Sequence, residues 1–232
     1  MSSRTLADVL ADICVMDGPL WQRLEAFADA QRTFGSSFAD AFQLMAGRFE
    51  RGEVGLDAPK LGDKMADFLL PDQKGRLTRL AELTERGPVV VSFNRGHWCP
   101  FCRIELTALA QAHEEFATLG AQIVSIMPDR QAFIGRLPRE VTRKLTILCD
   151  IDNAYALSLG LAMWVGDELQ AMMIEHGVSL EDAQGNPAWL VPVPATFVLA
   201  KGGLIIACKV EPDFRQRLDI EDIHRALVAA KD

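Results

Sequence analysis

One apolar run constrains the fold of this chain more than any other feature. Residues Pro88–Asn94 read PVVVSFN, with no charged side chain and no alternation of polar and apolar residues. A continuous run of this kind is typical of a strand that is buried on both faces of a parallel sheet. A short loop containing Gly96 follows, and Cys102–Thr118 then has the pattern of a helix. The sequence therefore predicts a buried strand that leads directly into a helix.

The rest of the chain continues this alternation and then changes it. We predict strands at Gln122–Met127 and Leu145–Cys149, a helix at Asn153–Leu161, a hairpin of Ala195–Ala200 and Leu204–Lys209 around Lys201-Gly202-Gly203, and a closing helix from Glu221 to Lys231. This order has parallel strands with crossover helices first and an antiparallel hairpin after them. It is the topology of a thioredoxin-like mixed sheet. The predicted fold class is α/β, a thioredoxin-like mixed sheet flanked by helices, and 162–190 reads as an insertion in it.

Residues 4–50 differ from the rest because they contain no strand-like run. Their apolar residues recur at helical spacing, and Asp17-Gly18-Pro19 is a stop-and-restart signal, so we predict two or three amphipathic helices. Arg51–Gly55 reads as a linker after them. We therefore divide the chain into an N-terminal helical extension, 1–55, and a thioredoxin-like domain, 56–232. The expected use of the extension is to cover a sheet edge or to form a homodimer contact.

Charge and hydropathy narrow the classes of function. The formal net charge is −8 and no basic stripe is present, which argues against nucleic acid as a partner. No apolar run approaches the roughly 20 residues that span a bilayer, so no membrane partner is expected. Asp8 and Asp12 interrupt the apolar residues near the N-terminus, and the five cysteines do not form a regular disulfide framework. We therefore expect a cytoplasmic protein.

The pair Cys99 and Cys102 stands where the predicted strand gives way to the predicted helix. A cysteine reacts as its thiolate, and the free N–H groups and positive dipole of a helix N-terminus stabilise that anion. Arg95, His97 and Arg103 add nearby positive or potentially positive charge. These features predict that Cys99 has a lowered pKa and is the attacking sulfur. Cys102 lies one helical turn deeper, where it can form or resolve a disulfide with Cys99.

The residues around the pair have supporting roles in this interpretation. Pro100 suits the first helical turn and limits how the two cysteines splay apart. Trp98 and Phe101 are expected to flank the pair with apolar surface on which a substrate docks. A zinc site is the competing explanation of a C-x-x-C motif, but it needs four ligands, and the other cysteines and histidines are scattered. We therefore expect no metal and no cofactor.

Three further residues leave alternatives open. Pro194 precedes a predicted strand, as a plain strand start or with a cis bond, and in a thioredoxin fold its loop faces the active-site helix. The backbone of Val193 would then be free to pair with a substrate. His97 is a candidate general base or an exposed loop residue. Glu105 is a helix-dipole partner or, less favoured, a proton shuttle.

The sequence resembles the alkyl hydroperoxide reductase/thiol-specific antioxidant superfamily, in particular a peroxiredoxin-like branch with a C-P-x-C motif. The matching blocks are Leu61–Phe68, Gly87 to Leu106, Val193–Val198 and Asp213–Arg217, in that order. Met65-Ala66 replaces the usual Ala-Pro in the first block. The resemblance implies a thioredoxin-like fold and thiol chemistry on peroxides or disulfides.

The active-site block departs from the pattern P-x-x-x-[TS]-x-x-C of typical peroxiredoxins. Counting back from Cys99, Gly96 occupies the Thr/Ser place and Ser92 the Pro place. Counting back from Cys102, Cys99 and Arg95 occupy those places. Where the family has an Arg before A-T-F, this chain has Pro194, and Arg95 is the available substitute.

Three hypotheses about function follow. The first is thiol–disulfide exchange, in which Cys99 attacks a disulfide and Cys102 releases the product. The second is reduction of hydroperoxides, in which Cys99 becomes a sulfenic acid that Cys102 condenses with. The third is a non-catalytic thioredoxin-fold module. Both enzyme hypotheses require a reductant protein or a small thiol as electron donor.

Overall fold

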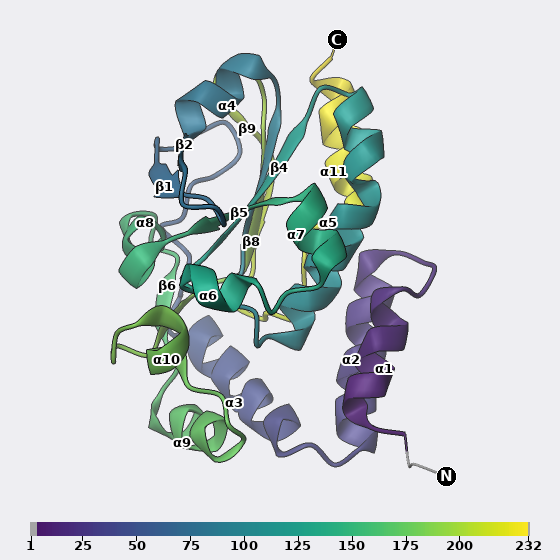
Figure 1. The fold of residues 1–232 in the computed structure, drawn as a ribbon, viewed down its shortest axis with the longest axis vertical. Helices are drawn as coiled ribbons and strands as arrows, with labels where there is room; N and C mark the ends of the chain where they lie inside the picture. Colours follow the sequence, from purple (N-terminus) through teal and green to yellow (C-terminus); the bar gives the residue numbers. More distant parts are fainter. Residues whose placement is uncertain (1–3, 232) are drawn as a thin grey trace.

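A five-stranded mixed sheet forms the centre of the computed structural model, which describes residues 4–231 (Figure 1). The first three strands of the sheet are parallel, and the last two run antiparallel to their neighbours. In sheet order the strands are β5 (Thr146–Cys149), β4 (Gln122–Met127), β3 (Val89–Phe93), β8 (Ala195–Leu199) and β9 (Ile205–Val210). This arrangement confirms the predicted thioredoxin-like mixed sheet.

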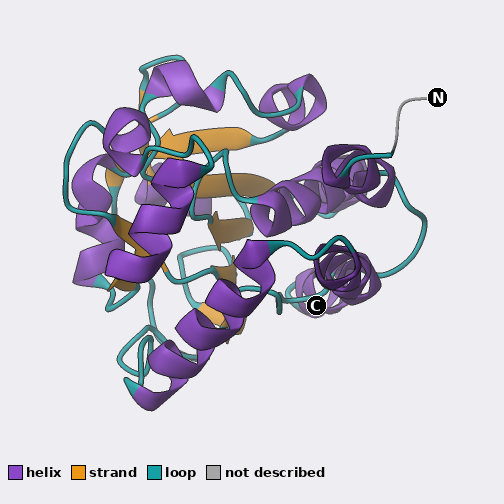
Figure 2. Cartoon of the chain, turned by 90° about the horizontal axis from the view of Figure 1, so that it is seen from below, coloured by secondary structure: helices purple, strands orange, loops and turns teal. Residues whose placement is uncertain are grey.

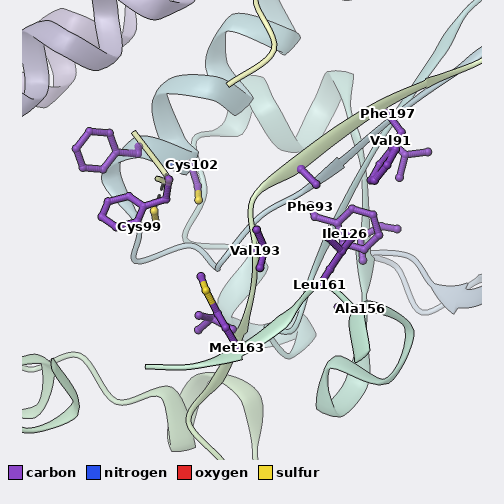
Figure 3. Close-up of a cluster of buried hydrophobic side chains, with 14 of the residues drawn as sticks. Val91, Phe93, Cys99, Cys102, Ile126, Ala156, Leu161, Met163, Val193 and Phe197 are labelled. Atoms are coloured by element: carbon purple, nitrogen blue, oxygen red, sulfur yellow. Dashed lines mark hydrogen bonds between the residues drawn. The ribbon is translucent and has the colours of Figure 1, made fainter. Parts of the chain in front are cut away.

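Helices cover both faces of this sheet (Figure 2). The main-domain helices are α4 (Leu80–Arg86), α5 (Pro100–Thr118), α6 (Gln131–Ile134), α7 (Arg139–Lys144), the 3₁₀ turn η1 (Ile151–Asn153), α8 (Ala154–Ser158) and α11 (Ile220–Ala229). On one face Val90 packs with Leu106 of α5 and Leu227 of α11. On the other face Val91 and Phe93 pack with Phe197 (Figure 3). All five residues of β3 are buried, as its apolar run predicts.

The N-terminal extension consists of three helices that pack on the rest of the molecule. They are α1 (Leu6–Cys14), α2 (Leu20–Thr33) and α3 (Ser37–Arg51). Thr5 caps α1 with a capping box, which satisfies orphan N–H groups of its first turn. Helices α1 and α2 lie against α5, and Phe27 of α2 meets Phe101 edge to face at 5.4 Å between ring centroids. The boundary at residue 55 stays a prediction.

The predicted insertion 162–190 has its own secondary structure. It contains β6 (Ala162–Trp164), α9 (Asp167–Glu175), α10 (Leu180–Gln184) and the start of β7 (Leu190–Pro192), and β6 pairs with β7 in a two-stranded sheet. Arg48 of α3 ties the extension to it, because its guanidinium donates to the carbonyls of Trp164 and Val165 at 2.8 and 2.9 Å.

One local prediction needs correction, and one hairpin was missed. The helix expected at Asn153–Leu161 is shorter, because Asp152 and Asn153 adopt positive φ angles and α8 ends at Ser158. A two-stranded hairpin, β1 (Leu69–Pro71) and β2 (Leu77–Arg79), was not predicted. None of the helices within residues 4–231 is both long enough and apolar enough to cross a bilayer.

Candidate active site

Cys99 lies at the N-terminus of α5, where strand β3 passes through a short loop into the helix. It is the N-cap residue, with extended backbone angles, and Pro100 takes the first helical position. Its sulfur caps the helix as a side-chain oxygen does at other N-caps, since Sγ accepts the N–H of Cys102 at 3.4 Å. A thiolate in this place faces the positive end of the helix dipole. The predicted placement of the pair at a strand-to-helix junction is thus what the structure shows.

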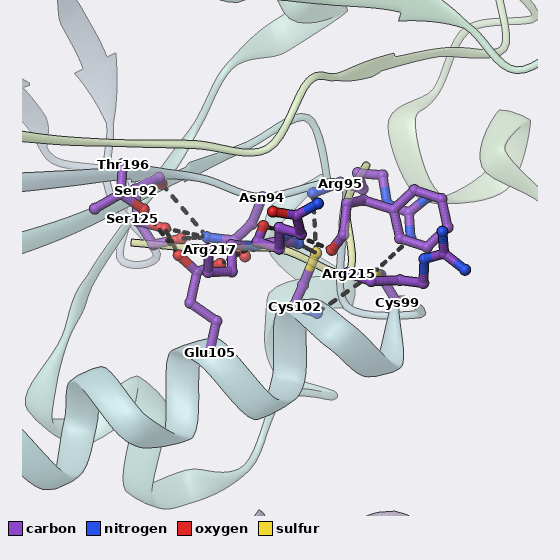
Figure 4. Close-up of polar contacts among 12 residues, drawn as sticks. Ser92, Asn94, Arg95, Cys99, Cys102, Glu105, Ser125, Thr196, Arg215 and Arg217 are labelled. Carbon is purple, nitrogen blue, oxygen red and sulfur yellow. Dashed lines mark hydrogen bonds and ion pairs between the residues drawn. The ribbon is translucent and has the colours of Figure 1, made fainter. Parts of the chain in front are cut away.

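Arg95 contacts the Cys99 sulfur directly. Its Nη2 donates to Sγ at 3.1 Å, and the residue is 1% exposed. Figure 4 shows the guanidinium directed at Cys99. Aromatic rings hold it there, because its Cζ lies 3.7 Å from the ring centroid of Phe214 and 5.5 Å from that of Phe42. The structure therefore places a fixed positive charge at this sulfur.

The charges around Cys99 favour its thiolate. Burial alone would raise the pKa, because the residue is fully enclosed. The hydrogen bond from Cys102 and the positive charges of Arg95 and Arg217 outweigh burial and lower the pKa from 9.0 to about 5. Arg103 was expected from the sequence to add positive charge near Cys99. In the structure its charge instead lowers the pKa of Cys14, although burial raises that pKa overall. Cys99 is consequently an anion at neutral pH.

The environment of Cys102 shifts its pKa in the opposite direction. Burial and the negative charge of Cys99 raise its pKa well above the usual value of a thiol, although Arg217 and Arg95 oppose this. Its sulfur accepts the N–H of Arg95 at 3.4 Å and lies 3.9 Å from Nη2 of Arg217. One thiolate and one thiol therefore lie side by side, which is the arrangement that a nucleophile and a resolving thiol require.

Gly96 has a structural reason to replace the Thr or Ser of typical peroxiredoxins. Its φ angle is +141°, a region that side chains rarely adopt. A Cβ there would come within 2.6 Å of Nε1 of Trp98 and 2.8 Å of Oδ1 of Asp129. Any side chain at this position would therefore strain the backbone and displace Trp98 or Asp129.

His97 is neither an exposed loop residue nor placed as a base for Cys99. Its Nδ1 bonds with Oδ2 of the buried Asp129 at 2.9 Å, and the same oxygen accepts its backbone N–H at 2.6 Å. Its side chain is only 13% exposed. The pair Asp129 and His97 fixes the conformation of the active-site loop.

The predictions for Val193 and Phe101 were wrong. The N–H of Val193 donates to the carbonyl of Leu161 at 2.5 Å, so it is not free to pair with a substrate. Pro194 is buried at the start of β8, and no peptide bond within residues 4–231 is cis. Phe101 is fully buried against Phe27, so only Trp98 of the two aromatic neighbours reaches the surface.

Glu105 and Arg217 form a buried ion pair that sequence reasoning missed. Nε of Arg217 donates to Oε2 of Glu105 at 2.7 Å, and each side chain is at most 2% exposed. Glu105 is therefore neither an exposed partner of the helix dipole nor a group in contact with Cys99. The sequence pointed to Arg217 only through the family-like block Asp213–Arg217. Nothing in that block indicates that Arg217 pairs with Glu105, 112 residues earlier in the chain.

A mainly apolar cavity of about 250 Å³ adjoins the active-site loop. Trp98 and Pro100, which flank Cys99 in the chain, form part of its wall. The extension supplies most of the remainder, including Leu10, Phe27 and Phe42. Within residues 4–231, no group of three or more His, Cys, Asp or Glu side chains is placed to hold a metal ion.

Comparison with known proteins places this site in a family. The sequence model of the AhpC/TSA family matches residues 61–208, which is more than half of the chain. This chain belongs to the AhpC/TSA family. The match includes Arg95, Cys99, Cys102 and Glu105, and confirms the resemblance drawn from the sequence. The narrower C-P-x-C branch stays a prediction.

Individual members of the family agree with this placement. Two Mycobacterium tuberculosis proteins provisionally named peroxiredoxins are 41% identical over 70 residues, 30% of this chain and 46% of theirs. The match thus spans less than half the length of these relatives. Peroxiredoxin Bcp of Bacillus subtilis is 26% identical over 132 residues, 55% of this chain and 81% of that protein.

Solved structures support the fold. The crystal structure of Peroxidoxin BcpB from Mycobacterium tuberculosis is similar with a TM-score of 0.55 and 26% identity, covering 73% of this chain and 97% of that one. Reduced Prx3 from Vibrio vulnificus, in complex with hydrogen peroxide, has a TM-score of 0.57 at 17% identity, covering 73% of this chain and 99% of that one. At that identity the second likeness concerns the fold alone.

Proposed function

We propose that this chain is a thiol-dependent peroxidase that reduces hydroperoxides with Cys99 as nucleophile and Cys102 as resolving thiol. The contact between Nη2 of Arg95 and Sγ of Cys99, at 3.1 Å, carries the proposal. It puts a buried positive charge where an attacking sulfur needs one, and where the leaving oxygen of a peroxide develops negative charge. The names of the related peroxiredoxins support the same chemistry.

The first step oxidises Cys99. Its thiolate attacks one oxygen of the hydroperoxide, the S–O bond forms and the O–O bond breaks. The leaving alkoxide, or hydroxide from hydrogen peroxide, takes a proton from solvent and departs as alcohol or water. The peroxide has gained two electrons, and Cys99 is a sulfenic acid.

The second step closes a disulfide. Cys102 loses its proton, its sulfur attacks the sulfur of Cys99, the S–S bond forms and the S–O bond breaks. Hydroxide leaves and combines with that proton as water. A reductant protein with two thiols, or two molecules of a small thiol, then regenerates the dithiol by two exchange reactions. Such a cycle suits a reducing compartment, which supports a cytoplasmic location. A homodimer stays a prediction.

The complete burial of Cys99 favours a small oxidant over a protein disulfide. We infer that the substrate approaches through the cavity between the extension and the active-site loop, because Trp98 and Pro100, the two chain neighbours of Cys99, line it. Thiol–disulfide exchange, the first hypothesis from the sequence, becomes the second candidate here, since a thiolate and a thiol at a helix start also suit it.

Thiol counting after one equivalent of hydrogen peroxide tests the proposal. We expect the reduced protein to lose two thiols, Cys99→Ser to lose none and Cys102→Ser to stop at a sulfenic acid. Cys149→Ser is the matched control, because burial raises the pKa of Cys149 to about 11 and so disfavours its thiolate. Loss of two thiols in Cys99→Ser would reject the assignment. Rapid reaction with a small disulfide but none with peroxide would favour the second candidate.

A further inference from the structure

The buried pair of Glu105 and Arg217 is held by more contacts than an ion pair alone requires. Oε1 of Glu105 accepts the hydroxyl of Ser92 at 3.0 Å and that of Thr196 at 2.9 Å, while Oε2 accepts Nε of Arg217. Arg217 also donates to the carbonyl of Gln216 at 2.7 Å. Both side chains are consequently fixed between β3, β8 and α5 (Figure 4).

Fold stability is a weak explanation for this pair. Removing two charges from water is costly, and replacing a buried ion pair with apolar side chains is often neutral or stabilising. The pair does have one contact that an apolar substitute would lack. Nη2 of Arg217 lies 3.9 Å from Sγ of Cys102, within a buried site. The positive charge is therefore directed at the second sulfur of the motif.

Each sulfur thus has an arginine of its own, Arg95 at Cys99 and Arg217 at Cys102. We propose that Arg217, positioned by Glu105, activates Cys102 as the nucleophile of the second step, after Cys99 has been oxidised. This inference rests on the proposed peroxidase function, because the reaction with peroxide is what oxidises Cys99. Arg217 contacts a reacting atom, whereas Glu105 acts through Arg217 as a positioning residue.

The charges of the site explain why the activation comes in this order. In the dithiol, the Cys99 thiolate stands beside Cys102 and opposes a second negative charge. Oxidation turns Cys99 into a neutral sulfenic acid, so this opposition disappears while Arg217 stays charged beside Glu105. Cys102 then releases its proton, attacks the Cys99 sulfur and displaces hydroxide, which takes up that proton as water. Arg217 supplies charge and no proton.

The test separates the two steps by stopped-flow measurement of sulfenic acid formation and of its conversion to disulfide. We expect Arg217→Met to slow disulfide formation at least about tenfold at neutral pH, since each unit in the pKa of Cys102 changes its thiolate fraction tenfold. Raising the pH restores the rate. Oxidation of Cys99 changes far less, because Arg95 remains. Arg217→Lys retains the charge and much of the rate.

Two further variants remove the ambiguities of this design. Glu105→Gln/Arg217→Met removes both charges together, so no uncompensated carboxylate is left in the core, and we expect the same slow, pH-shifted second step. Arg215→Met is the matched control, because Arg215 lies in the same segment, bonds to Asp213 and Gln43, and we expect wild-type rates from it.

Wild-type disulfide formation in both Arg217→Met variants would overturn the inference. A slow step with no shift in its pH profile and no rescue by lysine would assign Arg217 a structural role only, and would overturn it as well. If the wild-type protein does not react with peroxide, the proposed function fails. The inference is then tested by blocking Cys99 with methyl methanethiosulfonate and following release of methanethiol by Cys102, with the same variants and the same expected order of rates.

Discussion

Hydrogen bonds and neighbouring charges give the two cysteines their different properties, although the cysteines are only three residues apart. Both sulfurs are fully buried, and burial alone would raise both pKa values. Arg95 and the N–H of Cys102 bond to Cys99, so its pKa falls. Cys102 has the Cys99 thiolate as a neighbour, so its pKa rises. The division of labour in the pair therefore depends on neighbouring charges.

The pKa of Cys99 gives a prediction about pH. Because the pKa is lowered from 9.0 to about 5, the thiolate is present at neutral pH and is lost as the pH falls through about 5. The ultraviolet absorbance of the thiolate should follow that titration and be absent in Cys99→Ser. A titration step only above neutral pH would contradict the environment described here.

Gly96 gives a prediction about stability. Gly96→Thr introduces both a strained φ angle and a clash with Trp98 and Asp129, so we expect a loss of about 1–3 kcal/mol or more in the free energy of unfolding. Gly62→Thr is the control, since Gly62 also has a positive φ but open space around it. Denaturation in urea measures both. Equal losses in the two variants would show that the clash has no effect.

The three helices of the extension complete the site that α5 begins. Phe27 of α2 packs on Phe101, two residues after Cys99, and Phe42 of α3 lies against the guanidinium of Arg95. The extension thus supplies packing for the charge that activates the sulfur. The sequence predicted these helices but not their contact with the active site, because helical periodicity identifies an apolar face and not its partner.

Phe27→Ala tests the contact between α2 and α5. Phe27 is 2% exposed, so we expect the loss of about 3–5 kcal/mol that is typical of a buried Phe, together with faster alkylation of Cys99 as the packing loosens. Trp21→Ala removes an aromatic residue from the same helix at a position that is 55% exposed, and should have little effect. Similar results for the two variants would contradict this packing.

Ala7→Trp tests the cavity as the route to Cys99. Ala7 is exposed on α1 and lines the cavity, so an indole there should hinder a bulky substrate more than a small one. We expect the rate with cumene hydroperoxide to fall more than the rate with hydrogen peroxide. Ala11→Trp is the control, because Ala11 is also exposed on α1, one helical turn further along, but does not line the cavity. An equal effect on both peroxides would argue for another route.

Regular elements with a strong local pattern were predictable from the sequence. Strand β4 has the predicted bounds Gln122–Met127, and β3 follows from its apolar run. The hairpin of β1 and β2 was missed because its three-residue strands carry no usable periodicity. The pairing of Glu105 with Arg217 was missed because it joins residues 112 apart, and only the folded chain brings them together.

The environment of the two sulfurs extends beyond the residues that the family model matches. The family match, 61–208, contains both cysteines and Arg95, whereas Phe42, Phe214 and Arg217 lie beyond its ends. Phe42 and Phe214 hold the guanidinium of Arg95, and Arg217 contacts Cys102. The extension and the C-terminal segment therefore contribute to the environment of both sulfurs.

The rate at which hydrogen peroxide oxidises Cys99 in Arg95→Met tests the central claim most directly. Wild type, Arg95→Met and Arg95→Lys would be compared by stopped-flow fluorescence, with Arg215→Met as the control for loss of an arginine elsewhere. We predict that Arg95→Met slows oxidation about 10²-fold or more, the usual cost of losing one preorganised charge, and that Arg95→Lys recovers part of the rate. Oxidation of Arg95→Met at the wild-type rate would contradict the account.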